Sequence, residues 1–164
     1  MHEKYMKMAI AEASGALARG EFPVGCVIVG PDGLICTGRR KKSKVGNELE
    51  HAEIQALREV YRNFPEVSTD TLTVYSTMEP CLMCFATLIV NNIDTIVYSY
   101  EDVMGGGTNV PLDMLSPLYA EKKITIIKNV LRSDSLKLFK EFFHNQENEY
   151  LRDSLLATHT LAQN

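Results

Sequence analysis

Two short segments hold the side chains that could bind a metal and move protons. The first, residues 51–53, reads His-Ala-Glu, and the second, residues 80–84, reads Pro-Cys-Leu-Met-Cys. One imidazole and two thiolates form a neutral ligand set for Zn²⁺, and three protein ligands leave a fourth position where water binds and is activated. The ligands of this set are His51, Cys81 and Cys84. Glu53 is not needed as a ligand, so it is the candidate catalytic residue that moves protons.

Neither segment is specific by itself. A CxxC pair also occurs in redox sites and in structural zinc sites, and an acidic residue in the first turn of a helix often only stabilises the helix dipole. Here, however, both segments begin helices that we predict over residues 50–63 and 81–90. Helix N-termini direct N–H groups and positive dipole ends at the site, which favours thiolates. The combination therefore indicates a catalytic zinc centre.

The remaining elements have to bring these two helix starts together. Strands are expected at 24–29, 34–38, 72–76, 94–100 and 123–128, and further helices at 4–19, 112–119 and 133–146. The first two strands flank a turn and form an antiparallel hairpin, whereas the long connection between the last two favours a parallel crossover. This order predicts an α/β domain with a mixed five-stranded sheet over residues 1–146. Residues 147–164 are expected to be a C-terminal tail that extends the last helix or is disordered.

Composition narrows the class of protein. A chain of 164 residues with 45% hydrophobic and 23% charged residues fits one globular domain. No apolar run reaches the roughly 18 residues of a membrane span, and the first residues lack the apolar core of a signal peptide. We therefore expect a cytoplasmic protein that does not contact the membrane. Four cysteines in a chain of this length do not suggest a disulfide scaffold.

A net charge of −4 and a pI near 5.6 argue against general binding to nucleic acid. One basic run, residues 39–44, is the local exception. It is either a solvated loop or a phosphate-binding segment. The candidate phosphate-binding side chains are Arg39, Lys41, Lys42 and Lys44.

The two zinc segments together resemble the signature of the zinc nucleobase deaminases. Over residues 4–144 the chain is most similar to the tRNA adenosine deaminase branch of the cytidine deaminase-like superfamily, with further similarity at residues 22–29, at residues 97–107 and in the helix that carries Phe142 and Phe143. The resemblance implies a three-layer fold with helices on both faces of the sheet, one Zn²⁺ per subunit, a homodimer and hydrolytic deamination in which Glu53 moves the protons. Candidate substrate-binding residues are Pro23, Val24, Arg40, Ala52, Glu79 and Phe85.

The chain departs from this branch at two positions. An asparagine usually follows the second strand, where this chain has Arg39 and Arg40. Phe85 stands where related chains often have a small residue, so it either reshapes the pocket or is a core aromatic.

Three functions remain open at this point. The first is a tRNA adenosine deaminase that flips its base into the pocket while the basic run meets phosphates. The second is a deaminase of a free base, nucleoside or nucleotide of the guanine, cytosine or cytidine type, which the acidic pI and the missing asparagine favour. The third is a non-catalytic structural zinc module, which would not need Glu53 and would normally supply a fourth protein ligand.

Overall fold

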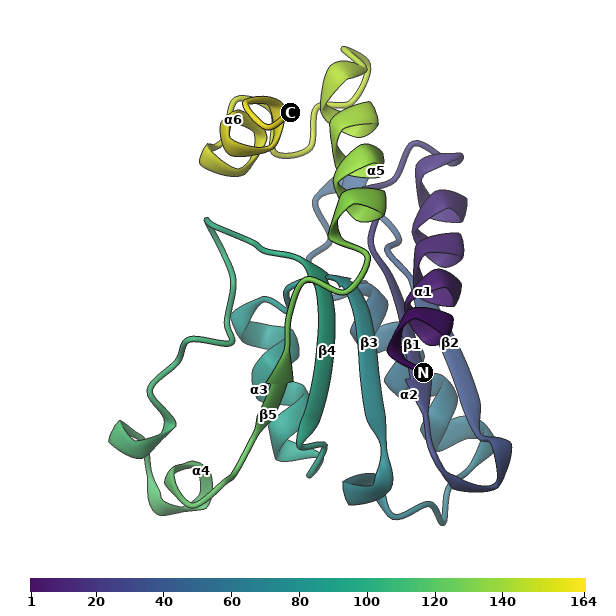
Figure 1. The fold of residues 1–164 in the computed structure, drawn as a ribbon, viewed down its shortest axis with the longest axis vertical. Coiled ribbons are helices and arrows are strands. Elements are labelled where there is room, and N and C mark those ends of the chain that lie inside the picture. Colours follow the sequence, from purple (N-terminus) through teal and green to yellow (C-terminus); the bar gives the residue numbers. More distant parts are fainter.

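A mixed five-stranded sheet forms the centre of the protein. The computed structural model describes residues 1–164, and its strands are β1 (Gly25–Val29), β2 (Ile35–Arg39), β3 (Thr73–Met78), β4 (Thr95–Tyr100) and β5 (Thr125–Ile127). They lie in the order β2-β1-β3-β4-β5 (Figure 1). β1 is antiparallel to β2 and β3, while β3, β4 and β5 are parallel. The predicted hairpin, the mixed sheet and the parallel crossover are therefore all confirmed.

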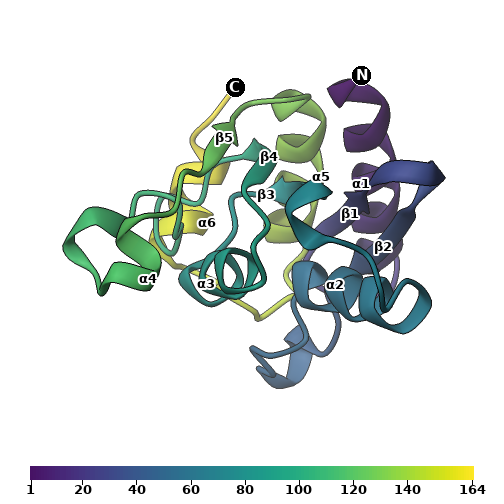
Figure 2. The same ribbon diagram turned by 90° about the horizontal axis from the view of Figure 1, so that it is seen from below.

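Helices cover both faces of this sheet (Figure 2). On one face lie α1 (His2–Leu17) and α5 (Arg132–His144), and on the other lie α2 (Ala52–Asn63) and α3 (Leu82–Val90). Each helix buries residues three and four positions apart, as a helix on a sheet must. In α1 these are Met6, Ala9, Ala13 and Ala16. The three-layer architecture expected from the resemblance is confirmed.

The connection between β4 and β5 holds two short pieces where one helix was predicted. A single helical turn spans Leu112–Met114, and α4 spans Pro117–Ala120. Ser116, with φ −59° and ψ 153°, is outside the helical region, which a residue that precedes a proline disfavours. The predicted helix over 112–119 is therefore broken before Pro117. No helix in the structure has both the length and the apolar character needed to span a bilayer.

The C-terminal tail neither extends the last helix nor is disordered, so both expectations for it were wrong. Residues 147–164 do not extend α5, and they are not without structure: they reverse direction and form a separate helix, α6 (Leu155–Leu161), beside α5 (Figure 1). Ser154 caps this helix by accepting a hydrogen bond of 3.2 Å from the backbone N–H of Ala157. Leu156 is buried in the main core, and its burial accounts for the return of the tail to the domain.

A polar cluster holds α6 against the end of β4. Arg132 donates hydrogen bonds to the carboxylate of Glu101, at 2.8 Å from Nε, and His159 lies 3.2 Å from the same carboxylate. Burial alone would raise the pKa of Glu101, but hydrogen bonds from Arg132, from the backbone and from His159 lower it to about 2. The hydroxyl of Tyr100 lies 3.0 Å from that of Thr160. The tail is therefore attached by ionic contacts as well as by apolar ones.

Candidate active site

The two predicted segments meet because α2 and α3 begin side by side on one face of the sheet. His51 is the N-cap of α2, and Cys81 is the N-cap of α3. The start of α2 approaches β2 closely at Gly38, where a Cβ would lie only 2.3 Å from the carbonyl oxygen of Ala52. Glycine at this position therefore lets the helix that carries Glu53 pack directly on the sheet.

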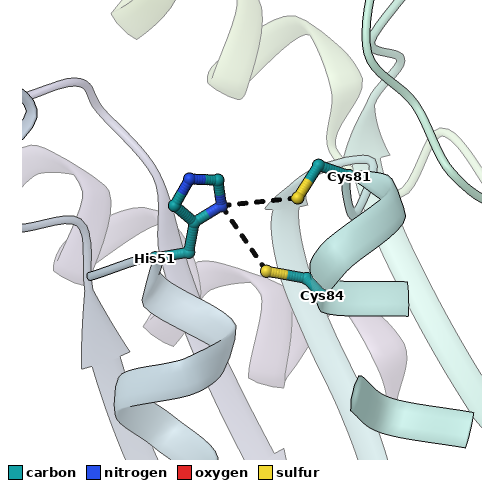
Figure 3. A group of neighbouring side chains, drawn as sticks. All are labelled: His51, Cys81 and Cys84. Carbon is teal, nitrogen blue, oxygen red and sulfur yellow. Dashed lines mark hydrogen bonds between the residues drawn. The ribbon is translucent and has the colours of Figure 1, made fainter. Parts of the chain in front are cut away.

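Three side chains form one group that fits a metal ion. Nδ1 of His51 lies 3.5 Å from Sγ of Cys81 and 3.5 Å from Sγ of Cys84 (Figure 3). Zinc with bonds of about 2.3 Å to sulfur and about 2.05 Å to nitrogen, at tetrahedral angles, requires a nitrogen–sulfur separation of about 3.6 Å. The donor types and the spacing therefore both fit Zn²⁺, and the group has three protein ligands with no fourth.

The electrostatics of this group favour metal binding. Hydrogen bonds from Cys84 and His51 lower the pKa of the Cys81 thiol to about 4, although burial raises it. Burial opposes protonation of His51, but its contacts with Cys81 and the charge of Glu53 raise its pKa to about 9. The hydrogen bond to Cys81 and burial raise the pKa of Cys84. A divalent cation that binds these atoms displaces the protons that they share.

Glu53 lies beside the metal-binding group without belonging to it. Its side chain is buried, with Oε1 at 3.1 Å from the hydroxyl of Ser76 and Oε2 at 3.5 Å from Sγ of Cys84. Burial raises its pKa above the ordinary value of a glutamate. A carboxyl group whose pKa is raised toward neutral pH exchanges protons more readily, as a general acid–base residue must.

A small cavity opens next to His51 and Glu53. Its volume is about 60 Å³, which is room for a few water molecules. Of the candidate substrate-binding residues, four line this cavity: Val24, Arg40, Ala52 and Glu79. Pro23 is not in its wall, and Phe85 is buried in the main core, as the core-aromatic alternative expects.

Residues that the sequence did not suggest complete the wall. They are Phe22, Met78 and Asp102, together with three residues of the tail: Tyr150, Leu151 and Leu156. Phe22 stands directly before the candidate Pro23, but no local pattern marks the tail residues. The site is therefore built from both ends of the chain.

The comparisons with known proteins agree with this geometry. Residues 1–100 match the family model described as the cytidine and deoxycytidylate deaminase zinc-binding region. The chain belongs to this deaminase family. A tRNA-specific adenosine deaminase of Buchnera aphidicola subsp. Schizaphis graminum is 32% identical over 144 residues, which cover 87% of this chain and 93% of that relative.

Solved structures share the fold of this deaminase. One, from a study of A-to-I editing by tRNA:A34 deaminases, has a TM-score of 0.69 at 24% identity and covers 82% of this chain and 98% of that one. Another, a guanine deaminase from Nitrosomonas europaea, has a TM-score of 0.67 at 20% identity and covers 85% of this chain and 83% of that one. At these identities the likeness establishes the three-layer fold alone.

Arg40 has a structural task in the deaminase. Its guanidinium is buried and donates hydrogen bonds to the carbonyl oxygens of Lys41, Asn47 (2.7 Å) and Glu50 (3.3 Å). These contacts tie the loop between β2 and α2 together, directly before His51. Arg40 thus lines the cavity, but most of its N–H donors are already bonded to other groups of the protein. It stands where the resemblance expects an asparagine.

The other basic side chains of residues 39–44 lie apart from the cavity. Arg39 forms an ion pair of 2.8 Å with Glu12 of α1. Lys41 lines a surface groove beside β2, Lys42 is exposed, and Lys44 lies near Gly20. Only Arg39 of this run lies in β2, and the residues after it belong to the loop that leads to α2, so neighbouring residues of the run have different surroundings.

The loop after β4 contacts residues 79–82 of the deaminase, the segment that carries Cys81. Glu79 is buried and accepts hydrogen bonds from the backbone N–H of Asp102 (3.1 Å) and from the hydroxyl of Thr108. The N–H of Gly107 donates to the carbonyl oxygen of Pro80 at 2.8 Å. A Cβ on Gly107 would lie 2.7 Å from the backbone of Leu82, so this glycine allows the loop to approach the start of α3.

Proposed function

We propose that this deaminase hydrolyses the exocyclic amine of an adenosine in tRNA, as a homodimer with one Zn²⁺ per subunit, in the cytoplasm. The observation that carries the chemistry is Glu53, a buried carboxyl with a raised pKa beside three metal-binding side chains that do not need it as a ligand. The substrate rests on the relative from Buchnera aphidicola, whose similarity extends over nearly its whole length.

The residues of the site have two roles, metal binding and proton transfer. His51, Cys81 and Cys84 would hold the ion, which when bound lowers the pKa of water toward 7 and polarises it for attack. Glu53 takes a proton from the attacking water and gives it to the ring nitrogen beside the carbon that bears the amine. As the carbon–nitrogen bond breaks, Glu53 passes the second proton of that water to the amine, which leaves as ammonia.

The cavity wall determines how the base is held during these transfers. Val24 and Ala52 provide apolar surface and backbone next to Glu53, and Phe22 adds an aromatic ring. Such walls exclude bulk water and fix orientation, which keeps the reacting carbon near the proton carrier.

The experiment compares Glu53→Gln with the wild type in two assays. Inosine formed in unmodified tRNA measures turnover, and bound metal is measured by elemental analysis. We expect Glu53→Gln to lose about 10²–10⁴-fold in kcat and to retain zinc, since Glu53 is not a ligand. Glu59→Gln, on the same helix but outside the cavity, is the matched control. Full turnover in Glu53→Gln would show that the proposed chemistry is wrong.

A deaminase of a free base or nucleoside is the second candidate. The observation that favours it is the tail, which covers the cavity with Tyr150, Leu151 and Leu156 and leaves little open space. Ammonia release from adenine, guanine, cytosine, their nucleosides and unmodified tRNA separates the two candidates. Turnover of a free compound with none on tRNA would replace the first candidate by the second.

The homodimer is proposed from the outer surface of α3. Leu82 and Val90 of this helix are more than half exposed, and contact with a second subunit would remove their apolar surface from water. Sedimentation equilibrium of the wild type and of Leu82→Glu tests the proposal. We expect a dimer that the substitution weakens, and a monomeric wild type would contradict it.

A further inference from the structure

His51 presents its two ring nitrogens to two different neighbours. Nδ1 faces the sulfur atoms of Cys81 and Cys84, and Nε2 lies 3.0 Å from Oε2 of Glu48 (Figure 3 shows the cysteine side). A carboxylate at that distance accepts a hydrogen bond from an N–H on Nε2, which leaves the lone pair of Nδ1 for a metal. The contact thus selects one tautomer and one orientation of the imidazole.

Glu48 is itself held by two further donors. Nη2 of Arg40 donates to Oε1 at 3.2 Å, and the hydroxyl of Tyr150 donates to Oε2 at 3.0 Å. The side chain of Glu48 is 56% exposed, so without these partners it would sample many rotamers in solvent. Arg40 is the buried residue directly after β2, and Tyr150 belongs to the C-terminal tail.

Tyr150 is oriented by two groups that pack against its ring. Its ring centroid lies 5.2 Å from that of Phe22, and the guanidinium carbon of Arg40 lies 5.4 Å from the centre of its ring. Contacts of these kinds orient an aromatic side chain. A continuous set of contacts therefore runs from the tail through Tyr150 and Glu48 to His51.

We propose that Glu48 is a positioning residue, which holds His51 with Nδ1 toward the cysteines, and that Tyr150 of the tail holds Glu48 for this purpose. The proposal rests on the zinc centre of the proposed function. Groups that orient a histidine ligand typically contribute 10–100-fold to metal affinity or activity. Glu48 and Tyr150 do not touch the reacting atoms in this scheme, and they act through His51.

The experiment measures zinc affinity directly, by competition with a fluorescent chelator, in the full chain. We expect Glu48→Ala to weaken zinc binding by about 10–100-fold and Tyr150→Phe, which removes only the hydroxyl, to weaken it less. Glu48→Gln keeps an oxygen that accepts from Nε2 and should restore most of the affinity lost in Glu48→Ala. Glu59→Ala removes a carboxylate of α2 that does not contact His51 and should match the wild type.

A spectroscopic readout separates positioning from general damage to the fold. In the zinc-loaded wild type we expect a slowly exchanging Nε2–H proton of His51 in long-range ¹H–¹⁵N spectra, and we expect that signal to broaden or vanish in Glu48→Ala. Because the side chain of Glu48 is exposed, the other signals of the Glu48→Ala spectrum should match those of the wild type.

The outcomes distinguish this inference from the proposed function. Equal zinc affinity and an unchanged His51 signal in Glu48→Ala would overturn the role of Glu48, and a Tyr150→Phe protein identical to the wild type would overturn the role of the tail. A wild type that binds no zinc would instead refute the proposed function itself.

Discussion

The hydroxyl of Ser76 donates a hydrogen bond of 3.1 Å to Oε1 of Glu53, and both side chains are buried. Ser76 lies on β3, the strand that leads through Glu79 and Pro80 to Cys81. One central strand therefore supports the proton carrier and also delivers a metal ligand. The position of Glu53 relative to Cys81 is therefore set by a central, buried strand of the sheet.

Replacement of Ser76 by alanine should slow catalysis and leave the metal site intact. A hydrogen bond to a carboxyl group is worth about 1.5 kcal/mol, which corresponds to roughly tenfold in rate. We therefore expect Ser76→Ala to lower kcat about tenfold, with zinc content unchanged. Ser99→Ala is the control, because Ser99 is a buried serine of β4 that donates to Leu131 and not to Glu53. An equal loss of kcat in both variants would mean that the effect is one of packing.

Removal of the metal should lower thermal stability as well as abolish turnover. A ligand that binds only the folded state stabilises it by about 4 kcal/mol at 1,000 times its Kd, which corresponds to about 8–16 °C in Tm for a domain of this size. Differential scanning calorimetry with and without chelator measures the shift. Cys84→Ala should show no shift, whereas Cys36→Ala, which removes a buried cysteine outside the group, should keep it.

Acidification below pH 4.5 should loosen the attachment of α6 to the end of β4. The pKa of Glu101 is lowered from 4.5 to about 2. A carboxyl group with a lowered folded-state pKa stabilises the fold fully above pH 4.5, and this contribution is lost as the pH falls toward 2. Hydrogen exchange of residues 155–161 should therefore show more protection in the wild type than in Glu101→Gln at pH 7. That difference should narrow between pH 5 and pH 2.5, and a constant difference would contradict the ionic role of Glu101.

Two adjacent leucines test whether α6 is held by burial. Leu156 is 1% exposed and Leu155 is 60% exposed. We expect Leu156→Ala to destabilise the docked tail by about 2–5 kcal/mol and Leu155→Ala to have little effect. Hydrogen exchange in α6 and denaturant unfolding of both variants measure the difference in stability. Similar losses of stability in the two variants would show that helix propensity, and not burial, holds the tail.

The metal-binding group could be predicted because its information is local. His51 and Cys81 are recognisable by residue type, and the helix start that orients each one is visible in the residues that follow it. The order of strands and helices could be predicted for the same reason, since each element has its own periodicity of apolar residues. Long elements with regular patterns need no knowledge of distant partners.

The rest of the cavity could not be predicted because its contacts join distant parts of the chain. Tyr150 meets Glu48 across 102 positions, and nothing in the sequence near Tyr150 indicates that partner. α6 has only 7 residues, which is too short for a helical period to be distinguished from chance. Phe85 was ambiguous for another reason: its helix is apolar on nearly every side, so the pattern does not show which face meets the cavity.

The tail residues of the cavity wall are the last part of this site to be synthesised. Ribosomes add about 5–20 residues per second, so the roughly 65 residues between Cys84 and Tyr150 take about 3–13 s to synthesise. All three metal ligands exist during this interval, while the last wall of the cavity does not. Zinc that binds the three ligands in this interval would enter a site that still lacks the wall formed by Tyr150, Leu151 and Leu156.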